Sequence, residues 1–448
     1  MIKGTDGMIK PTLIAVMVAT ALVGCGEGGS SSAGAGYGQV DTGTGGNTGG
    51  GNSGGDNSGG DNSGGDGGGG DNSGGTTFSQ TQLLVDITDN VLVPTYQSFQ
   101  SATQSQKQSV ADYCTAVVED ATNSSSEQLA AQQDWKMVAG IWQQAEMMQI
   151  GPLVSNNYAL RNTIYSWPVV SRCGVDQDVI YAENGNINGS SYDLAQRTDT
   201  RRGIDALEHL LFSNNLDHNC NSNIDIVNGW NARSETDRMI ARCQFAVIVA
   251  DDLAMNATTL VNSWTGTTGY AAVLKAAGDA SNEYETSLKG INAISDGMFY
   301  VDSVTKDNKL AKPVGILDNN CGGGICPEHL ESTLSGQSVE HIINNLEGFS
   351  KLFYASASGA ADEQTVGFDD FLIDVGDSDT ATNMGQALLA AKSLAESLNM
   401  PLSQLLTEDP EQVEALHSEV KAVTDKLKTD FITSLALELP QTSAGDND

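Results

Sequence analysis

The sequence predicts an all-α protein in which a pair of helix bundles follows a disordered tether. Apolar residues recur at helical spacing in most segments between residues 80 and 439, and Gly, Asn and Asp stand between these segments. No run of alternating residues bounded by turn residues indicates a sheet. Residues 26–77 are mainly Gly, Ser, Asn and Asp, which offer too little apolar surface to offset the entropy of ordering.

The first 24 residues match a secretory signal peptide. Lys3 and Lys10 precede an apolar run over residues 11–24, which is too short to span a bilayer and has the length of a signal-peptide core. Residues 22–25, Leu-Val-Gly-Cys, resemble a bacterial lipobox. We therefore expect acylated Cys25 to become the mature N-terminus and to bind outer-membrane lipid. The alternative is a chance Cys after an ordinary cleavage site.

Gly26 rather than Asp follows Cys25, so no inner-membrane retention signal is present. An outer-membrane lipoprotein of the cell envelope is therefore favoured, on either face of that membrane.

Four regions are expected after the signal peptide. The lipidated Cys and the disordered linker cover residues 25–77. An N-terminal bundle over 78–265 and a C-terminal bundle over 266–440 follow, before a disordered tail at 441–448.

The charge of the chain excludes one class of partner. Acidic residues number 57 against 22 basic residues, and the formal net charge is −35. A nucleic acid or an anionic lipid surface would be repelled, so neither is expected as a partner. The acidity favours cations near the surface and leaves a partner protein of the envelope open.

The predicted helices follow one another with few interruptions. The first contains Pro94, the second carries Trp135 and Trp142, and the longest is a continuous amphipathic run. The predicted helices cover residues 80–99, 127–149, 202–212, 234–264, 270–294, 338–356, 381–398 and 410–439.

The helix over residues 202–212 combines an apolar stripe with polar side chains that can bind a metal ion. At about 100° per residue, Asp205, Glu208 and His209 fall within about 100° of one another, on the side opposite Ile204 and Leu207. Three potential ligands therefore face the same way. The alternative is that these acids only form solvated pairs on the helix surface, for example with Arg201.

Six cysteines remain beyond Cys25, and an even number in an exported chain indicates disulfides. Cys321 and Cys326 flank Gly-Gly-Gly-Ile and are near enough to pair with each other. Cys114 and Cys243 lie in helical patterns and could join two helices, which would leave Cys173 with Cys220. A thiolate metal site is the alternative, and an oxidising compartment disfavours it.

The helix over residues 202–212 resembles the signature of the imelysin-like family, Gly-x-His-x-x-Glu before an apolar run. Gly203 and Glu208 match this signature, and Asp205 stands in place of the His. Other segments of the chain are similar to the family in the same order. They are residues 92–99, Trp142 with Glu146 and residues 151–152, residues 166–168 with Asp176, residues 309–315, and residues 331–354.

The resemblance implies an all-helical fold of two bundles with a metal site at the signature helix. Members have been described as metallopeptidases or as parts of iron-uptake systems. By resemblance, Glu208 matches the motif Glu and Glu146 matches the acidic residue of an earlier block, while Asp205 replaces the motif His. The replacement puts a peptidase activity in doubt but leaves a metal site open.

Coordination chemistry explains why the replacement of His by Asp puts a peptidase activity in doubt but not a metal site. Hydrolytic zinc sites use His or Cys ligands and an open water position, whereas this chain has five His and no His-Glu-x-x-His. Asp205, Glu208 and Glu146 would instead form an oxygen-rich site for a hard divalent or trivalent cation such as iron or calcium. His209 could add one nitrogen.

Three functions are consistent with these residues. The first is a lipid-tethered metal-binding accessory, for example in iron acquisition, and this non-enzymatic function is favoured. The second is a metallopeptidase of the imelysin type. The third is a non-catalytic module that binds another envelope protein.

Overall fold

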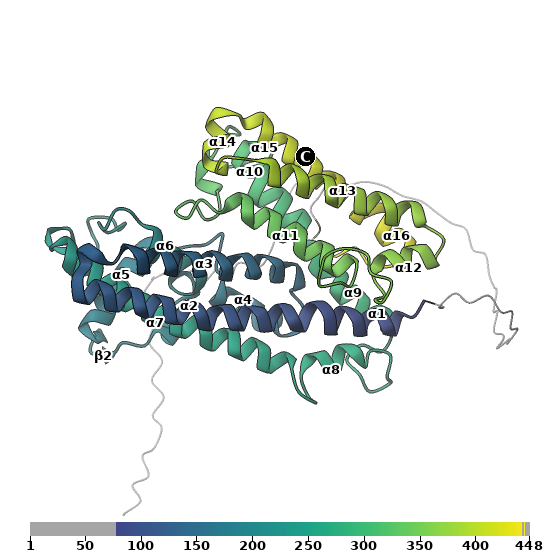
Figure 1. Ribbon diagram of the computed structural model, residues 1–448, viewed down its shortest axis with the longest axis horizontal. Coiled ribbons are helices and arrows are strands. Elements are labelled where there is room, and N and C mark those ends of the chain that lie inside the picture. The colour runs from purple at the N-terminus through teal and green to yellow at the C-terminus, as the bar shows by residue number, and fades with distance from the viewer. Residues whose placement is uncertain (1–77, 441–442, 444–448) are drawn as a thin grey trace, which may run out of the picture. The chain divides into compact units, whose positions relative to one another are not determined.

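The computed structural model describes residues 78–440 and residue 443, and this part of the chain is mostly helical, with turns and loops between the helices (Figure 1). The all-α prediction is therefore confirmed. The predictions for residues 1–77, Cys25 included, and for nearly all of the tail lie outside the described residues. None of the described helices combines the length and apolar character needed to cross a membrane.

The α-helices differ widely in length, and two-residue strands form one small antiparallel hairpin. The α-helices are α1 (Gln80–Ile87), α2 (Val93–Asp120), α3 (Ser125–Ala145), α4 (Ser155–Ile164), α5 (Arg172–Asn184), α6 (Gly203–Phe212), α7 (Glu235–Trp264), α8 (Tyr270–Lys275), α9 (Ser287–Met298), α10 (Lys312–Val314), α11 (Ser338–Phe353), α12 (Phe368–Asp374), α13 (Ser378–Ser397), α14 (Leu402–Glu408), α15 (Pro410–Lys426) and α16 (Ile432–Ser434). The strands are β1 (Asn186–Ile187) and β2 (Ser190–Ser191).

Short 3-10 and π-helical segments connect these elements. The π-helical segments are η1 (Thr88–Leu92), η9 (Val301–Ala311) and η11 (Leu427–Phe431). The 3-10 segments are η2 (Ala121–Asn123), η3 (Glu146–Met148), η4 (Gly151–Leu153), η5 (Leu194–Gln196), η6 (Asp199–Arg201), η7 (Asp225–Val227), η8 (Trp230–Ala232) and η10 (Pro327–His329).

The helices of the first half pack around the long helices α2 and α7. Helix α2 lies against α3 and α7, while α6 packs on α3 and α7. Trp135, Trp142 and Trp264 are fully buried in the core between these helices, as expected for core residues. Ser234 begins α7 because its hydroxyl accepts a hydrogen bond from the backbone N–H of Asp237.

The helices of the second half pack around α13 and α15, with α11, α12, α14 and η9 against them. Helix α11 also packs on α3, so the two halves are in direct contact. At one of these contacts, a Cβ on Gly348 would lie 2.5 Å from the carbonyl oxygen of Gln144, and only glycine fits there. The predicted domain boundary at residue 265 stays a prediction.

Two predicted helices differ in the structure from their expected form. The helix predicted over residues 80–99 continues through Pro94 to the end of α2. The π-helical segment η1 precedes the proline and relieves the clash that a proline ring makes in a regular helix. The segment predicted as one helix over 270–294 is divided into α8 and α9. Here the Asn282 side chain binds the Val273 carbonyl, and Thr286 caps α9, so local polar bonds replace the helix.

Candidate functional site

Neighbouring groups hold helix α6 at both of its ends. A Cβ on Gly203, whose φ is +73°, would lie 2.3 Å from the Ile164 carbonyl oxygen, so glycine is required where α6 begins against α4. The Trp135 indole donates to the Ile204 carbonyl at 2.9 Å, and the Gln132 amide donates to the Leu211 carbonyl at 2.7 Å. These bonds from α3 fix the direction in which the α6 side chains point.

Asp205 is buried, and neutral groups hold its carboxylate. Its Oδ2 accepts hydrogen bonds from the backbone N–H of Ser166 at 2.7 Å, the backbone N–H of Trp167 at 3.1 Å and the Ser166 hydroxyl at 3.1 Å. Burial raises the pKa of Asp205 to about 7, and the nearby Glu208 adds to this rise. The hydrogen bonds offset only part of the cost of burying the charge.

Glu208 repeats this arrangement one turn further along α6. Its Oε1 accepts hydrogen bonds from the backbone N–H of Ser335 at 2.9 Å and from the Ser335 hydroxyl at 2.8 Å. Burial raises the pKa of Glu208 above its usual value despite these bonds. Two carboxylates on one helix thus share an environment that favours their neutral forms.

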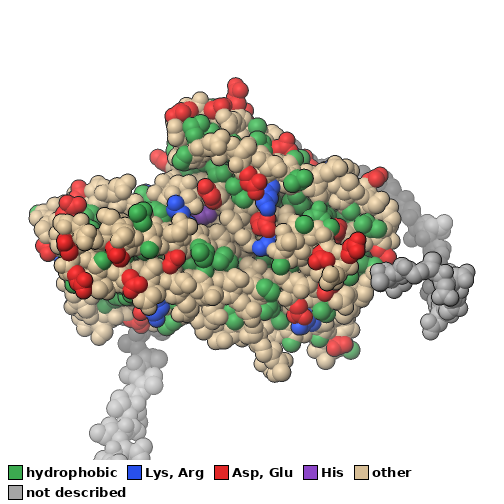
Figure 2. Space-filling model, in the orientation of Figure 1, with side chains coloured by type: hydrophobic (Ala, Val, Ile, Leu, Met, Phe, Trp, Pro, Cys, Tyr) green, Lys and Arg blue, Asp and Glu red, His purple; other side chains and the backbone are tan. Residues whose placement is uncertain are grey.

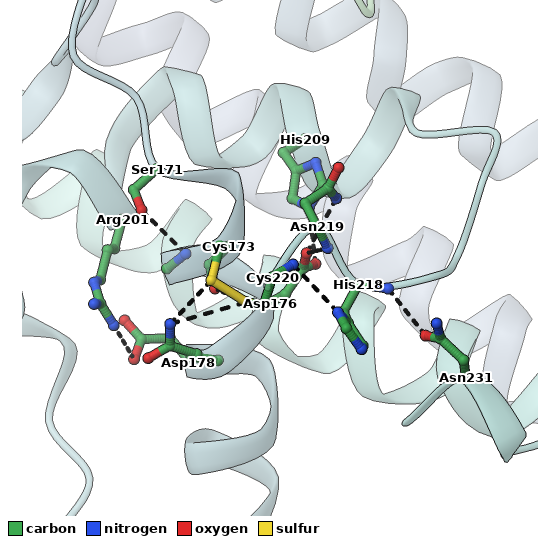
Figure 3. The surroundings of a disulfide bond; sticks show 12 residues. Ser171, Cys173, Asp176, Asp178, Arg201, His209, His218, Asn219, Cys220 and Asn231 are labelled. Atoms are coloured by element: carbon green, nitrogen blue, oxygen red, sulfur yellow. Dashed lines mark hydrogen bonds and ion pairs between the residues drawn. A yellow bond between two sulfur atoms is a disulfide. The ribbon is translucent and has the colours of Figure 1, made fainter. Parts of the chain in front are cut away.

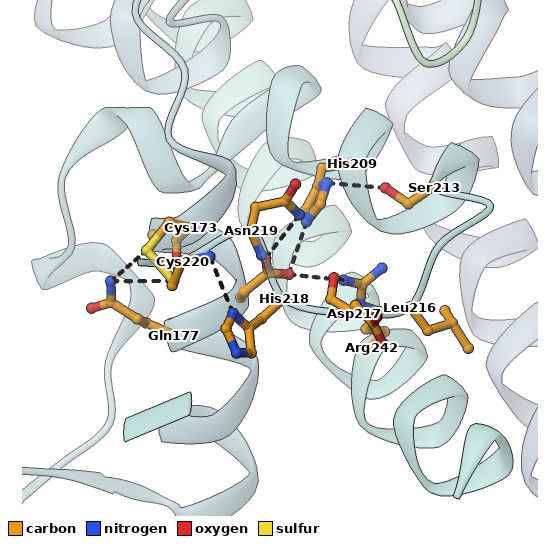
Figure 4. Close-up of polar contacts among 12 residues, drawn as sticks. Cys173, Gln177, His209, Ser213, Leu216, Asp217, His218, Asn219, Cys220 and Arg242 are labelled. Atoms are coloured by element: carbon orange, nitrogen blue, oxygen red, sulfur yellow. Dashed lines mark hydrogen bonds and ion pairs between the residues drawn. A yellow bond between two sulfur atoms is a disulfide. The ribbon is translucent and has the colours of Figure 1, made fainter. Parts of the chain in front are cut away.

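His209 belongs to a structural network (Figure 4). Its Nε2 lies 2.9 Å from Asp176, and its Nδ1 lies 3.0 Å from the Ser213 hydroxyl. Arg242 donates to the same Asp176 oxygen at 2.9 Å. Burial lowers the pKa of His209, which favours the neutral ring. Because both ring nitrogens have partners, His209 could bind a metal ion only by giving up one of these hydrogen bonds.

The three α6 side chains line one cavity of about 710 Å³, which we call the α6 cavity. Its walls come from α6, from the start of α5 and from the segment between η10 and α11. Trp167, Arg172, Asp205, Glu208, His209 and Glu328 are among the lining residues. The common face predicted for Asp205, Glu208 and His209 therefore opens into a space that a ligand can enter.

Glu146 lies elsewhere. It forms an ion pair with the Arg161 guanidinium at 2.9 Å and accepts a hydrogen bond from the Gln149 amide at 2.7 Å. It lines a different cavity, and the two cavities share no lining residue. Within the part of the chain that the structure describes, no three His, Cys, Asp or Glu side chains are grouped as a metal site.

The sequence did not single out a buried ion pair that lies between the two cavities. The Lys309 ammonium lies 2.9 Å from the Glu331 carboxylate and donates to the Gln143 side-chain oxygen at 2.6 Å. Tyr165 also hydrogen-bonds to Glu331. Both residues begin segments that resemble the family, but a single Lys or Glu in a helical pattern indicates neither its burial nor its partner.

The charge of Glu331 is compensated by these neighbours. Burial alone would raise the pKa of Glu331, but the charges of Lys309 and His341 and the hydrogen bonds from Tyr165 and Lys309 together hold that pKa below its usual value. Burial lowers the pKa of Lys309, against the effect of Glu331. Lys309 also lies 5.6 Å from the Trp167 ring and 5.5 Å from the Tyr300 ring.

The cysteine pairing predicted from the sequence is confirmed. Disulfides join Cys114 to Cys243, Cys173 to Cys220 and Cys321 to Cys326. The first joins α2 to α7. The second joins the start of α5 to the segment after α6, beside Asn219, whose backbone N–H donates to Asp176 at 2.7 Å (Figure 3). This disulfide therefore supports the network around His209.

The chain is similar to proteins of known sequence and structure. The iron-regulated protein A of Synechococcus elongatus is 25% identical over 280 residues, which cover 60% of this chain and 64% of that protein. The chain thus spans just under two thirds of the length of this curated relative.

Two crystal structures share the fold. One is described as an iron-regulated protein A precursor from Parabacteroides distasonis, with a TM-score of 0.60 and 18% identity over 81% of this chain and 97% of that one. The other is an imelysin-like protein from Psychrobacter arcticum, with a TM-score of 0.59 and 17% identity over 81% of this chain and 96% of that one.

A family model identifies the family of this chain. The model for imelysin matches residues 92–429, well over half of the chain, and this range includes helix α6 with Asp205 and Glu208. The chain therefore belongs to the imelysin family.

Proposed function

We propose that this chain is a metal-binding accessory of the bacterial envelope, which holds a hard cation at Asp205 and Glu208 in the α6 cavity. One observation carries the proposal. Two buried carboxylates from successive turns of α6 line the same cavity, and burial raises the pKa of both. A raised pKa means that the ionised form lacks compensation, which a cation would supply in place of a proton.

The donor atoms favour a hard metal ion. Carboxylate oxygens suit iron(III), calcium or magnesium better than zinc. Two carboxylates do not complete a ligand set, so water or a chelator bound with the metal would fill the remaining positions. The sequence suggested His209 and Glu146 as further ligands. His209 would have to give up one of its present hydrogen bonds to take part, and Glu146 lines the other cavity.

Iron is the cation that we favour. The relatives from Synechococcus elongatus and Parabacteroides distasonis are both called iron-regulated protein A. An acidic chain of net charge −35 also attracts cations to its surface. We therefore place the protein in iron acquisition.

A metallopeptidase activity is the second candidate, because the family is named for a peptidase. The chain lacks a His-Glu-x-x-His segment, and Asp205 replaces the His of the family signature. A zinc-activated water would need imidazole ligands, which Asp205 does not provide. Proteolysis assays with and without a chelator test this activity directly.

The proposed location rests on the lipobox-like residues 22–25. Acylation of Cys25 would anchor the chain in outer-membrane lipid, and residues 26–77 would separate the helical part from the bilayer. A protein partner in the envelope, including one that the chain serves only as a binding module, belongs to the same proposal. Cys25→Ser is expected to move the protein to the soluble fraction, and membrane association equal to wild type would contradict the anchor.

Calorimetric titration tests the metal site. Wild type, Glu208→Gln and Asp205→His would each be titrated with a soluble iron(III) chelate, calcium and zinc. We expect Glu208→Gln to lose binding of the hard cation, and Asp205→His to shift preference toward zinc, since imidazole favours it.

Asp374→Asn is the matched control, because Asp374 is an exposed acid on α12. Circular dichroism confirms that each variant is folded. Identical titrations for wild type, Glu208→Gln and Asp205→His would end the metal-site proposal.

A further inference from the structure

The second cavity, of about 880 Å³, is built from different elements than the α6 cavity. Its lining comes from η3, η4, α4, the start of α8, the segment between α8 and α9, α9 and the start of η9, with Pro440. Its volume lies within the range of roughly 300–1,000 Å³ that is common for small-molecule sites. The family signature on α6 contributes nothing to it, so its ligand is a separate question.

Four tyrosines line this space, which we call the tyrosine cavity: Tyr158, Tyr270, Tyr284 and Tyr300. The hydroxyls of Tyr270 and Tyr284 lie 2.5 Å apart, and their rings meet edge to face. Tyr270 also packs edge-on against buried Trp264, with ring centroids 5.2 Å apart. These contacts hold the two rings in place without a ligand, so the aromatic wall is preorganised.

A glycine makes room for the aromatic wall. Gly151 has a φ of +54°, and a Cβ there would lie 2.3 Å from the Tyr270 ring. Any other residue would push the ring away from its place in the lining. The shape of the cavity therefore depends on a residue that has no side chain.

The charges on the lining are all negative. Glu146, Glu283 and Asp296 contribute carboxylates, and the described lining contains neither Lys nor Arg. The Arg161 guanidinium behind the wall is already paired with Glu146. Glu283 and Asp296 are exposed, so a ligand can reach them from solvent. Partial loss of hydration at the cavity wall and the nearby Glu438 raise the pKa of Asp296 to about 6, which a bound cation would reverse.

We propose that the tyrosine cavity binds an organic cation, with an ammonium group carried on an apolar body. The faces of tyrosine rings attract a cation, and carboxylates at the edge of the cavity neutralise it. Ile150, Pro152 and Phe299 offer apolar surface for the remainder of the ligand. An anion would meet the carboxylates of Glu283 and Asp296 and no basic side chain on the described lining, so charge disfavours it.

A series of three probes with one carbon skeleton tests the proposal. Calorimetry on the purified full-length chain would compare 4-phenylbutylammonium with neutral 4-phenylbutanol and anionic 4-phenylbutyrate. We expect the ammonium to bind at least about tenfold more tightly than the alcohol, and the carboxylate to bind least. Equal affinity for the ammonium and the alcohol, or tighter binding of the carboxylate, would overturn the proposal.

Two pairs of variants localise the binding. Asp296→Asn keeps the size of an exposed side chain while removing its charge, and is expected to weaken ammonium binding about fivefold, while Asp374→Asn on α12 leaves it unchanged. Tyr284→Leu is expected to weaken binding similarly, and Tyr284→Phe, which keeps the ring, to retain it within about twofold. Binding that is unchanged in both Asp296→Asn and Tyr284→Leu would show that the cation binds elsewhere.

Discussion

Two sets of buried carboxylates in this molecule have similar burial and different surroundings. Glu146 and Glu331 lie in the interior, where Arg161 and Lys309 form ion pairs with them. Asp205 and Glu208 lie on the α6 cavity, and the hydrogen bonds that they accept come from backbone N–H groups and serine hydroxyls. All four residues are at most 7% exposed.

The difference appears in their titration. The neighbours of Glu331, with Lys309 contributing most, hold its pKa below the usual value against the effect of burial, whereas burial raises the pKa of Asp205 to about 7 and raises that of Glu208. Neutral donors replace part of the hydration of a carboxylate but do not cancel its charge. Burial by itself therefore does not distinguish a structural acid from a ligand-binding one, and the charge of the partner does.

The largest effect is expected from breaking an interior pair. Lys309→Met would leave Glu331 buried without its cation and is expected to lower the free energy of unfolding by about 3–5 kcal/mol. Urea unfolding at pH 7 measures this loss. The double variant Lys309→Met/Glu331→Gln should recover part of the lost stability. A loss below about 1 kcal/mol in the single variant would remove the contrast between the two regions.

Asp205→Asn is expected to raise the free energy of unfolding, whereas Lys309→Met lowers it. The folded-state pKa of Asp205 is raised, so its stabilising contribution is complete below the unfolded pKa of about 3.9 and is lost as the pH rises to about 7. At pH 8 and without metal, the variant should be more stable than wild type by an amount on the order of 3 kcal/mol. Unfolding curves at pH 4.5 and 8 test this, since the difference should shrink at the lower pH. A variant that is less stable at pH 8 would refute the uncompensated charge.

The pH dependence of metal binding sharpens the same contrast. If the cation displaces a proton from Asp205, affinity for calcium should rise about tenfold per pH unit below about 7 and level off above it. Titrations at pH 5.5, 6.5 and 8 give the slope. Affinity that does not change over this range would separate metal binding from Asp205.

The smallest effect is expected at an exposed pair. Lys107 and Asp251 lie 2.9 Å apart, with side chains 48% and 45% exposed. Lys107→Ala is expected to change the free energy of unfolding by less than about 0.5 kcal/mol, because water screens the pair. The same urea experiment measures it. A loss comparable to that of Lys309→Met would mean that burial does not control these energies.

Several of the longer helices were predictable from local pattern, whereas α4, α5, α12, α14 and the second half of α2 were not predicted. Helix α7 begins after Ser234 and ends at Trp264, as expected, because the apolar period and the cap agree. The segment over 270–294 kept the apolar period but is interrupted by turns after α8, where the Asn282 side chain binds the backbone. The spacing of apolar residues does not show where a polar side chain competes for the backbone hydrogen bonds of a helix.

The site was predictable only as far as a single helix reaches. Spacing on α6 placed Asp205, Glu208 and His209 on one face, and they line one cavity. Their partners come from other segments: Ser166, Asp176 and Ser335. Spacing within one helix carries no information on which distant residue faces a side chain, and for that reason the pairing of Glu146 with Arg161 was missed.

The placement of the disulfides has a consequence for how the chain can be recombined. Two of them join residues within 78–265, and the third closes a short loop within 266–440. Exchanging the second half for that of another family member would break no disulfide. Whether the exchanged halves pack together would depend on polar side chains where they meet. Lys309 in the second half hydrogen-bonds to Gln143 in the first, and Glu331, its ion-pair partner, accepts a hydrogen bond from Tyr165. A chimera is therefore expected to fold when both of these partnerships are kept together.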